Sequence, residues 1–106
     1  MATSKTPVAV ANGLRRIGDD LATWRKLRRL TVEQVADRAG ISRYTIMRLE
    51  NGGGATVENL LRVCRALGVL DLLVVALDPY RTDVGRLRSE EALPKRVRRP
   101  KAGEEQ

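Results

Sequence analysis

Residues 31–52 of this chain read TVEQVADRAGISRYTIMRLENG. Thr31 is a good helix N-cap and Gln34 follows at capping-box spacing, so a short helix is predicted to begin directly after Thr31. Gly40 suits the left-handed position that ends a helix, and Ser42 is the expected N-cap of a second helix. Two capped helices joined by so short a turn are typical of a helix-turn-helix, whose second helix lies in the DNA major groove.

Apolar residues predict one helix before this stretch and one after it. From residue 14 to residue 30 they recur at intervals of three and four, which is the spacing of one helical face. These residues are Ile17, Leu21, Trp24, Leu27 and Leu30. Thr56 is a third N-cap, Gly68 is a stop signal, and Cys64 lies on the apolar stripe between them. We therefore expect Cys64 in the core.

Residues 69–78 read VLDLLVVALD and have no clean period. Consecutive valines and the short length favour a strand, but a fifth helix is nearly as well supported. A lone strand would need to pair with another chain. A four-helix monomer cannot bury every apolar side chain here, so we expect a dimerisation element. Its residues are Leu70, Leu72, Leu73, Val74, Val75 and Leu77.

The 106 residues are enough for one domain with tails. We predict a flexible N-terminal arm over 1–12, a DNA-binding and dimerisation domain over 13–78, and a basic, largely disordered tail over 79–106. Twenty Lys and Arg residues against thirteen Asp and Glu residues give a net charge of +7. Such a balance favours a polyanionic partner, of which nucleic acid is the commonest.

Several function classes are excluded by composition. The chain has no His and one Cys, so the commonest general base, the commonest metal ligand and an intramolecular disulfide are all missing. We predict no enzymatic activity, no metal and no cofactor. Glu33 and Glu50 are expected to be helix-surface or capping groups rather than a catalytic pair. The longest apolar run, 72–77, is too short to span a bilayer, and we expect a cytoplasmic protein.

The stretch LTVEQVADRAGISRYTIMRLENG resembles the XRE/Cro-type helix-turn-helix family of the lambdoid phage repressors, over about residues 14–68. The resemblance implies an all-α, lambda-repressor-like bundle of four to five helices, with a C-terminal intersubunit β-strand as the alternative for residues 69–78. Two positions depart from the family pattern. Arg29 stands where many members have Gly, and Val32 stands where many have a Gln that touches a phosphate.

The resemblance also implies roles for the residues of the second helix and its surroundings. The implied base-reading residues are Arg43, Tyr44, Met47 and Arg48. The implied phosphate-contacting residues are Arg25, Ser42, Thr45 and Asn51. The chemistry suits these roles, because Arg can bond guanine O6 and N7 in a bidentate way and hydroxyl groups at a helix N-terminus suit phosphate.

The C-terminal part, ALDPYRTDVGRLRSEEALPKRVRRPK, is similar to HipB-type antitoxins, which accompany HipA-like kinases. In those proteins a strand after the last helix pairs with its twin in the dimer. The implied function is a homodimeric repressor of its own promoter in a type II toxin-antitoxin operon, with a HipA-like kinase toxin as partner. The alternative is a stand-alone XRE-family repressor of transcription. Two roles are open for the tail. It contacts DNA through Arg96, Arg98 and Arg99, or it lies on the surface of a toxin.

Overall fold

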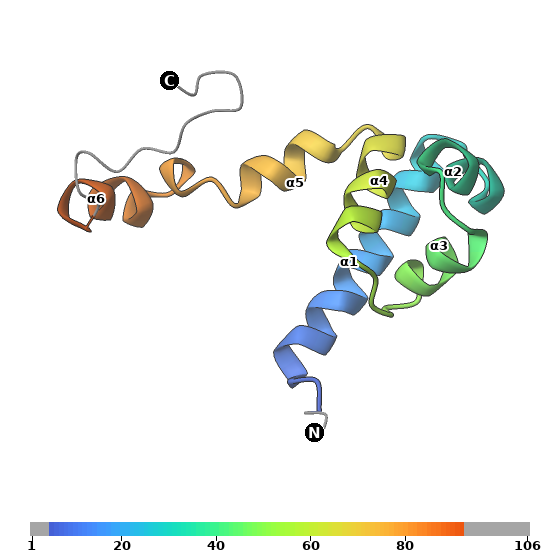
Figure 1. The fold of residues 1–106 in the computed structure, drawn as a ribbon, viewed down its shortest axis with the longest axis horizontal. Helices are drawn as coiled ribbons and strands as arrows, with labels where there is room; N and C mark the ends of the chain where they lie inside the picture. Colours follow the sequence, from blue (N-terminus) through green and yellow to red (C-terminus); the bar gives the residue numbers. More distant parts are fainter. Residues whose placement is uncertain (1–4, 93–106) are drawn as a thin grey trace, which may run out of the picture. The chain divides into compact units, whose positions relative to one another are not determined.

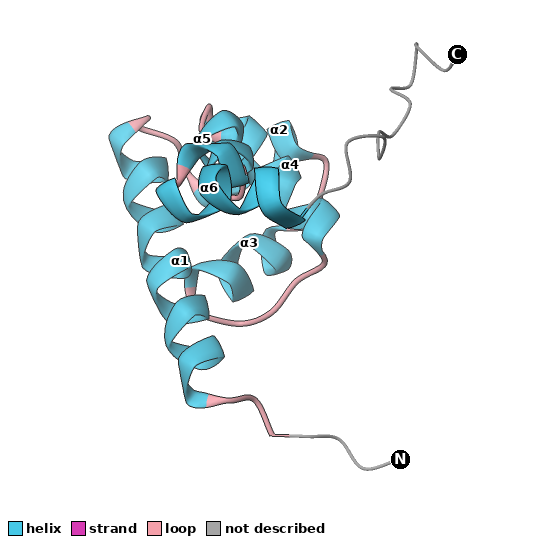
Figure 2. Ribbon diagram, turned by 90° about the vertical axis from the view of Figure 1, so that its left-hand side faces the viewer, coloured by secondary structure: helices cyan, strands magenta, loops and turns pink. Residues whose placement is uncertain are grey.

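The computed structural model describes residues 5–92, and all regular secondary structure in this part of the chain is helical (Figure 2). The helices are α1 (Val8–Leu27), α2 (Val32–Ala39), α3 (Arg43–Glu50), α4 (Val57–Leu67), α5 (Leu70–Ala76), the 3₁₀ helix η1 (Pro79–Arg81) and α6 (Asp83–Ala92). The predicted all-α helix-turn-helix bundle is confirmed. The chain divides into two compact units between Asp71 and Leu72.

Helix α1 begins at Val8, five residues before the predicted domain boundary at residue 13. The flexible arm predicted for 1–12 is therefore wrong for residues 8–12, while residues 1–4 lie outside the described part. Asn12 and Gly13 form a typical turn pair, yet here they lie inside the helix. Pro7 directly precedes the helix, where a proline is well tolerated, and its carbonyl accepts the first helical hydrogen bond from the Ala11 N–H at 3.0 Å.

The predicted caps of the helix-turn-helix are confirmed. Thr31 Oγ1 accepts from the Gln34 N–H at 3.0 Å, and Gln34 Oε1 accepts from the Thr31 N–H at 2.8 Å. These two bonds are the complete capping box. Helix α2 ends at Gly40, which has a φ of 71°. Ser42 caps α3 by accepting from the Thr45 N–H at 3.2 Å.

Helices α1 to α4 gather in the first unit (Figure 1). Apolar side chains from these helices form its core. The most buried large side chains are Val35, Ile46, Val63 and Leu67. Cys64 is buried as predicted, and burial raises the pKa of its thiol. Two residues of α1 depart from the predicted inward face. Leu27 is 67% exposed, because α1 ends there, and Ile17 is 42% exposed. The fold thus holds α2 and α3 on a scaffold made by α1 and α4.

Helix α1 approaches α3 closely at Gly18, which is buried. A Cβ atom at this position would overlap the Leu49 carbonyl oxygen and would lie 3.0 Å from the Glu50 carbonyl oxygen. Both oxygens belong to the last turn of α3. The absence of a side chain at Gly18 therefore lets the two backbones meet, and this contact fixes the end of the second motif helix against α1.

Residues 70–76 form helix α5, so the strand interpretation of this segment is wrong and the fifth-helix alternative is right. The physical reason is hydrogen bonding. A helix satisfies its own N–H and C=O groups, whereas a single strand leaves them without partners. No residue of α5 is buried, and four apolar side chains in α5 or directly after it are exposed. These are Leu72 (61%), Val74 (56%), Val75 (38%) and Leu77 (83%).

Residues 79–81 and 83–92 are helical rather than disordered, which corrects the prediction for this part of the tail. Asp78 caps η1 by accepting from the Tyr80 N–H at 2.9 Å. Thr82 accepts from the Gly85 N–H at 2.9 Å at the start of α6. Local caps of this kind stabilise short helices without a large core. The predicted DNA-arm residues Arg96, Arg98 and Arg99 lie outside the described residues.

The link between α1 and α2 contains a strained residue. Arg29 has a φ of 58°, a left-handed conformation that costs a non-glycine residue about 1–2 kcal/mol. We expect Arg29→Gly to raise the free energy of unfolding by about 1 kcal/mol, since Gly relieves this strain and loses part of the gain to chain entropy. Urea unfolding measures the change. Gly40→Ala, at a φ of 71°, should change stability in the opposite direction, and an Arg29→Gly variant no more stable than the parent contradicts the assignment.

Candidate nucleic-acid interface

Helix α3 has one face in the core and one in solvent. Ile46 and Leu49 are 1% and 5% exposed and pack inward. The four predicted base-reading residues are all exposed on the other side, at positions one and four apart along the helix. They are Arg43, Tyr44, Met47 and Arg48. Tyr44 is 75% exposed and Met47 is 37% exposed. The fold therefore presents these four side chains together on one accessible helical face.

Arg43 lies at the first position of α3 and makes an ion pair with Glu33 of α2, with Nη1 3.3 Å from Oε2. Both side chains are more than half exposed, at 56% and 61%. An exposed pair of this kind contributes at most about 1 kcal/mol. The guanidinium of Arg43 can therefore leave Glu33 for a stronger acceptor at little cost.

The start of α3 also carries the predicted hydroxyl pair. The Ser42 and Thr45 hydroxyl oxygens lie 3.1 Å apart and are hydrogen-bonded to each other. They stand beside the N–H groups of the first turn of α3, which carry the positive end of the helix dipole. Asn51 follows the last turn as the exposed C-cap residue. Three of the predicted phosphate-contacting residues thus lie at the two ends of α3.

Arg48 lies against the loop that follows α3. Its Nε donates to the Gly54 carbonyl oxygen at 3.1 Å, and its own carbonyl accepts from the Gly53 N–H at 2.7 Å. This arrangement uses Nε and leaves the two Nη groups at the outer end of the side chain. Arg48 therefore has a part in the loop conformation that sequence reasoning did not predict.

Arg25, the fourth predicted phosphate-contacting residue, lies in a mostly buried ion pair with Glu50. Its Nε is 2.7 Å from Glu50 Oε2 and its Nη2 is 3.0 Å from Oε1, while Nη1 donates to the Leu30 carbonyl at 3.1 Å. The side chains are only 16% and 13% exposed. Hydrogen bonding to Glu50 raises the pKa of Arg25, which further favours its charged form. Its phosphate contact stays a prediction, and its position in the fold is that of a structural group.

Glu50 corrects the expectation of a surface or capping carboxylate. It joins the end of α3 to α1 through Arg25. A signal for this role was present in the sequence. An acidic residue in the last turn of a helix faces the negative end of the dipole, which is unfavourable without a nearby cation. The sequence could have indicated that Glu50 needs a basic partner, but not which one.

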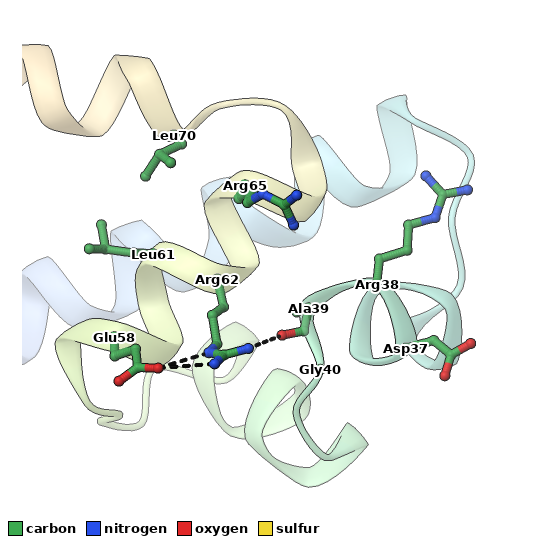
Figure 3. Close-up of a pocket in the computed structure, with 9 residues that line it drawn as sticks. All are labelled: Asp37, Arg38, Ala39, Gly40, Glu58, Leu61, Arg62, Arg65 and Leu70. Atoms are coloured by element: carbon green, nitrogen blue, oxygen red, sulfur yellow. Dashed lines mark hydrogen bonds and ion pairs between the residues drawn. The ribbon is translucent and has the colours of Figure 1, made fainter.

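A pocket of about 410 Å³ opens beside α2 and α4 (Figure 3). Within it, Arg62 donates to Glu58 at 3.1 Å and to the Ala39 carbonyl at 3.2 Å, so it ties α4 to the end of α2. None of the eight predicted DNA-contacting residues lines this pocket. The candidate interface is therefore the exposed face of α3 and not the pocket.

Comparison with protein families bears on the same part of the chain. Residues 21–72 match the helix-turn-helix family model. Residues 21–72 are an XRE-type helix-turn-helix domain. The domain is that of a DNA-binding regulator of transcription. A search of curated proteins finds no match to the chain. In addition, no helix in residues 5–92 is long and apolar enough to cross a membrane.

The helix-turn-helix domain begins inside α1 and ends inside α5. It contains α2, α3 and α4 complete, and with them all eight predicted DNA-contacting residues. Residues 8–20 of α1 and everything after Leu72 lie outside the match. Among residues 5–92, no three metal-ligating side chains come together. The chemistry that the domain offers is hydrogen bonding and ion pairing from α3 and its flanks.

Proposed function

We propose that this protein is a cytoplasmic, sequence-specific repressor of transcription that binds its operator as a homodimer. The observation that carries the proposal is the exposed face of α3, where Arg43, Tyr44, Met47 and Arg48 lie together on a helix-turn-helix domain. Arg43 and Arg48 suit guanine O6 and N7. Tyr44 offers a hydroxyl and an apolar ring face for a thymine methyl. Repression then follows from occupation of a promoter.

Arg43→Ala should weaken binding to the selected operator by about 1–3 kcal/mol and leave random duplex DNA nearly unaffected. The operator is first selected from a random duplex library, and the variant is then titrated on operator and random DNA at one salt concentration. Arg65→Ala on α4 is the matched control, because it removes an exposed Arg away from α3. Equal losses on operator and random DNA for Arg43→Ala would remove the base-reading role.

The homodimer is proposed from α5, an apolar helix with no buried residue. Its predicted dimerisation residues are Leu70, Leu72, Leu73, Val74, Val75 and Leu77. Six of the seven residues of α5 are apolar, and so apolar a helix needs a covering partner. A two-fold dimer also matches a palindromic operator with half-sites about 10 base pairs apart. Within the second unit, which begins at Leu72, Tyr80, Val84 and Leu87 are further exposed large apolar residues.

Lysine at both Leu73 and Val75 is expected to give a folded monomer that binds the operator weakly. The reason is that two charges on α5 cannot be buried in an apolar interface without a large desolvation penalty. Sedimentation velocity at micromolar concentration measures the mass, and circular dichroism checks the fold. A wild-type protein that sediments as a monomer, or a footprint without an inverted repeat, contradicts the homodimer.

The helical state of α5 favours a stand-alone repressor over a HipB-type antitoxin. The resemblance to HipB-type antitoxins implies a strand after the last domain helix, and residues 70–76 are helical instead. The antitoxin role with a HipA-like kinase partner therefore rests on sequence resemblance alone. Co-purification from the native operon tests it. A kinase-sized protein that stays bound through purification supports the antitoxin role, and a regulator that purifies alone supports the stand-alone repressor.

A further inference from the structure

The first half of α1 is a feature of this chain that the helix-turn-helix domain does not include. The family match begins at residue 21, whereas α1 begins at Val8. In Figures 1 and 2 the first turns of α1 extend beyond the helices of the motif. Gly18 fixes this part of α1 against the last turn of α3. Residues just before Gly18 are therefore held near the end of the helix that is proposed to read DNA.

Arg15 lies against the loop that follows α3. A Cβ atom at Gly52 would be 2.9 Å from Arg15 Cγ and 3.3 Å from Arg15 Cα. The Arg15 side chain is exposed, and its guanidinium donates to Asn12 Oδ1 one turn earlier on α1. Because Asn12 is neutral, this hydrogen bond does not neutralise the charge of Arg15, which stays available to an anion.

Arg48 of α3 contacts the next residue of the same loop, Gly53. A Cβ atom at Gly53 would be 2.7 Å from Arg48 Cγ, and Arg48 Nε binds the Gly54 carbonyl. Gly52 thus lies against Arg15 of α1, and Gly53 lies against Arg48 of α3. The absence of side chains at Gly52 and Gly53 lets the two Arg side chains lie directly against the loop backbone. An exposed Arg held next to the end of the proposed DNA-reading helix is suited to bind a phosphate.

We propose that Arg15 contacts a phosphate of the operator beside the bases read by α3, so that the N-terminal half of α1 extends the DNA interface beyond the helix-turn-helix domain. The inference rests on the proposed function. A phosphate contact carries no sequence information, but it sets the position of the protein on the duplex. It also releases condensed counterions, which makes affinity more dependent on salt.

Arg15→Ala is expected to weaken binding to operator and to random duplex DNA by the same factor, about tenfold, since one charged hydrogen-bond partner is lost. The slope of log affinity against log salt should become shallower by about 0.9. Arg16→Ala is the matched control. It removes the same charge from the next exposed residue, which lies about 100° further around α1, and it should change affinity far less.

Ethylation interference gives a second measurement that does not depend on affinity alone. Wild-type protein should be sensitive to ethylation at one phosphate per half-site that Arg15→Ala ignores, while the other sensitive phosphates are unchanged. Equal affinity losses for the two variants, or an unchanged set of sensitive phosphates, overturn the contact and leave the proposed function standing. A wild-type protein that binds no duplex at all overturns both.

Discussion

Arg25→Ala is expected to lower the free energy of unfolding by about 3 kcal/mol, because it leaves the Glu50 carboxylate mostly buried without its partner. The pair is bidentate, at 2.7 and 3.0 Å, and joins α1 to the end of α3. Loss of the pair therefore frees the helix on which base reading is proposed to depend. Urea unfolding followed by circular dichroism measures the change.

The chain supplies a matched control for this prediction. Arg43→Ala breaks the exposed pair with Glu33 and should cost less than about 1 kcal/mol. The double variant Arg25→Met, Glu50→Leu should recover much of the loss, since no charge is then left buried. If Arg25→Ala costs no more than Arg43→Ala, the Arg25–Glu50 pair has no structural role. The DNA affinity of Arg25→Ala should be measured only under conditions in which the variant is folded.

Gly18→Ala is expected to destabilise the domain by about 3 kcal/mol, at the upper end of the range for overpacking. A Cβ atom here meets the backbone carbonyls of Leu49 and Glu50, which cannot move aside as the end of a flexible side chain can. The two helices must then separate, and the last turn of α3 moves with them. Thermal unfolding should show a clear drop in Tm.

Gly13→Ala tests the same change elsewhere in the same helix. Gly13 also lies inside α1, but no atom lies within 4 Å of an added Cβ. Because Ala is a better helix former than Gly, this variant should be more stable by about 1 kcal/mol. Opposite signs at the two glycines separate close packing from helix propensity. If both variants change stability in the same direction, Gly18 is not a close-packing site.

The Arg25–Glu50 pair and the close contact at Gly18 have the same effect on α3. Each holds the last turn of α3 against α1, one through the Glu50 carboxylate and the other through the backbone. The exposed side chains of α3 are thereby fixed on a rigid element. Rigid placement matters for base recognition, because a bidentate Arg contact depends on both distance and angle.

The sequence by itself determined the features that depend on neighbouring residues. Thr31, Ser42 and Thr56 cap their helices as predicted, and Gly40 and Gly68 end helices in the left-handed conformation. A cap needs only a side chain and a backbone N–H three residues on, so its signal is local. The helical period likewise placed Ile46, Leu49 and Cys64 in the core. The motif and its exposed face followed from these features.

Only the tertiary structure decided the features that join distant residues. Arg25 and Glu50 are 25 positions apart, and nothing in either local pattern indicates that they meet. The closeness of Gly18 to Leu49, and of Arg15 to Gly52, depends on how α1 crosses α3. The start of α1 at Val8 and the helical state of residues 70–76 also differed from the preferred interpretation of their local sequence. Local propensities are worth about 1 kcal/mol or less per residue, so backbone hydrogen bonding within a helix outweighs them in these two segments.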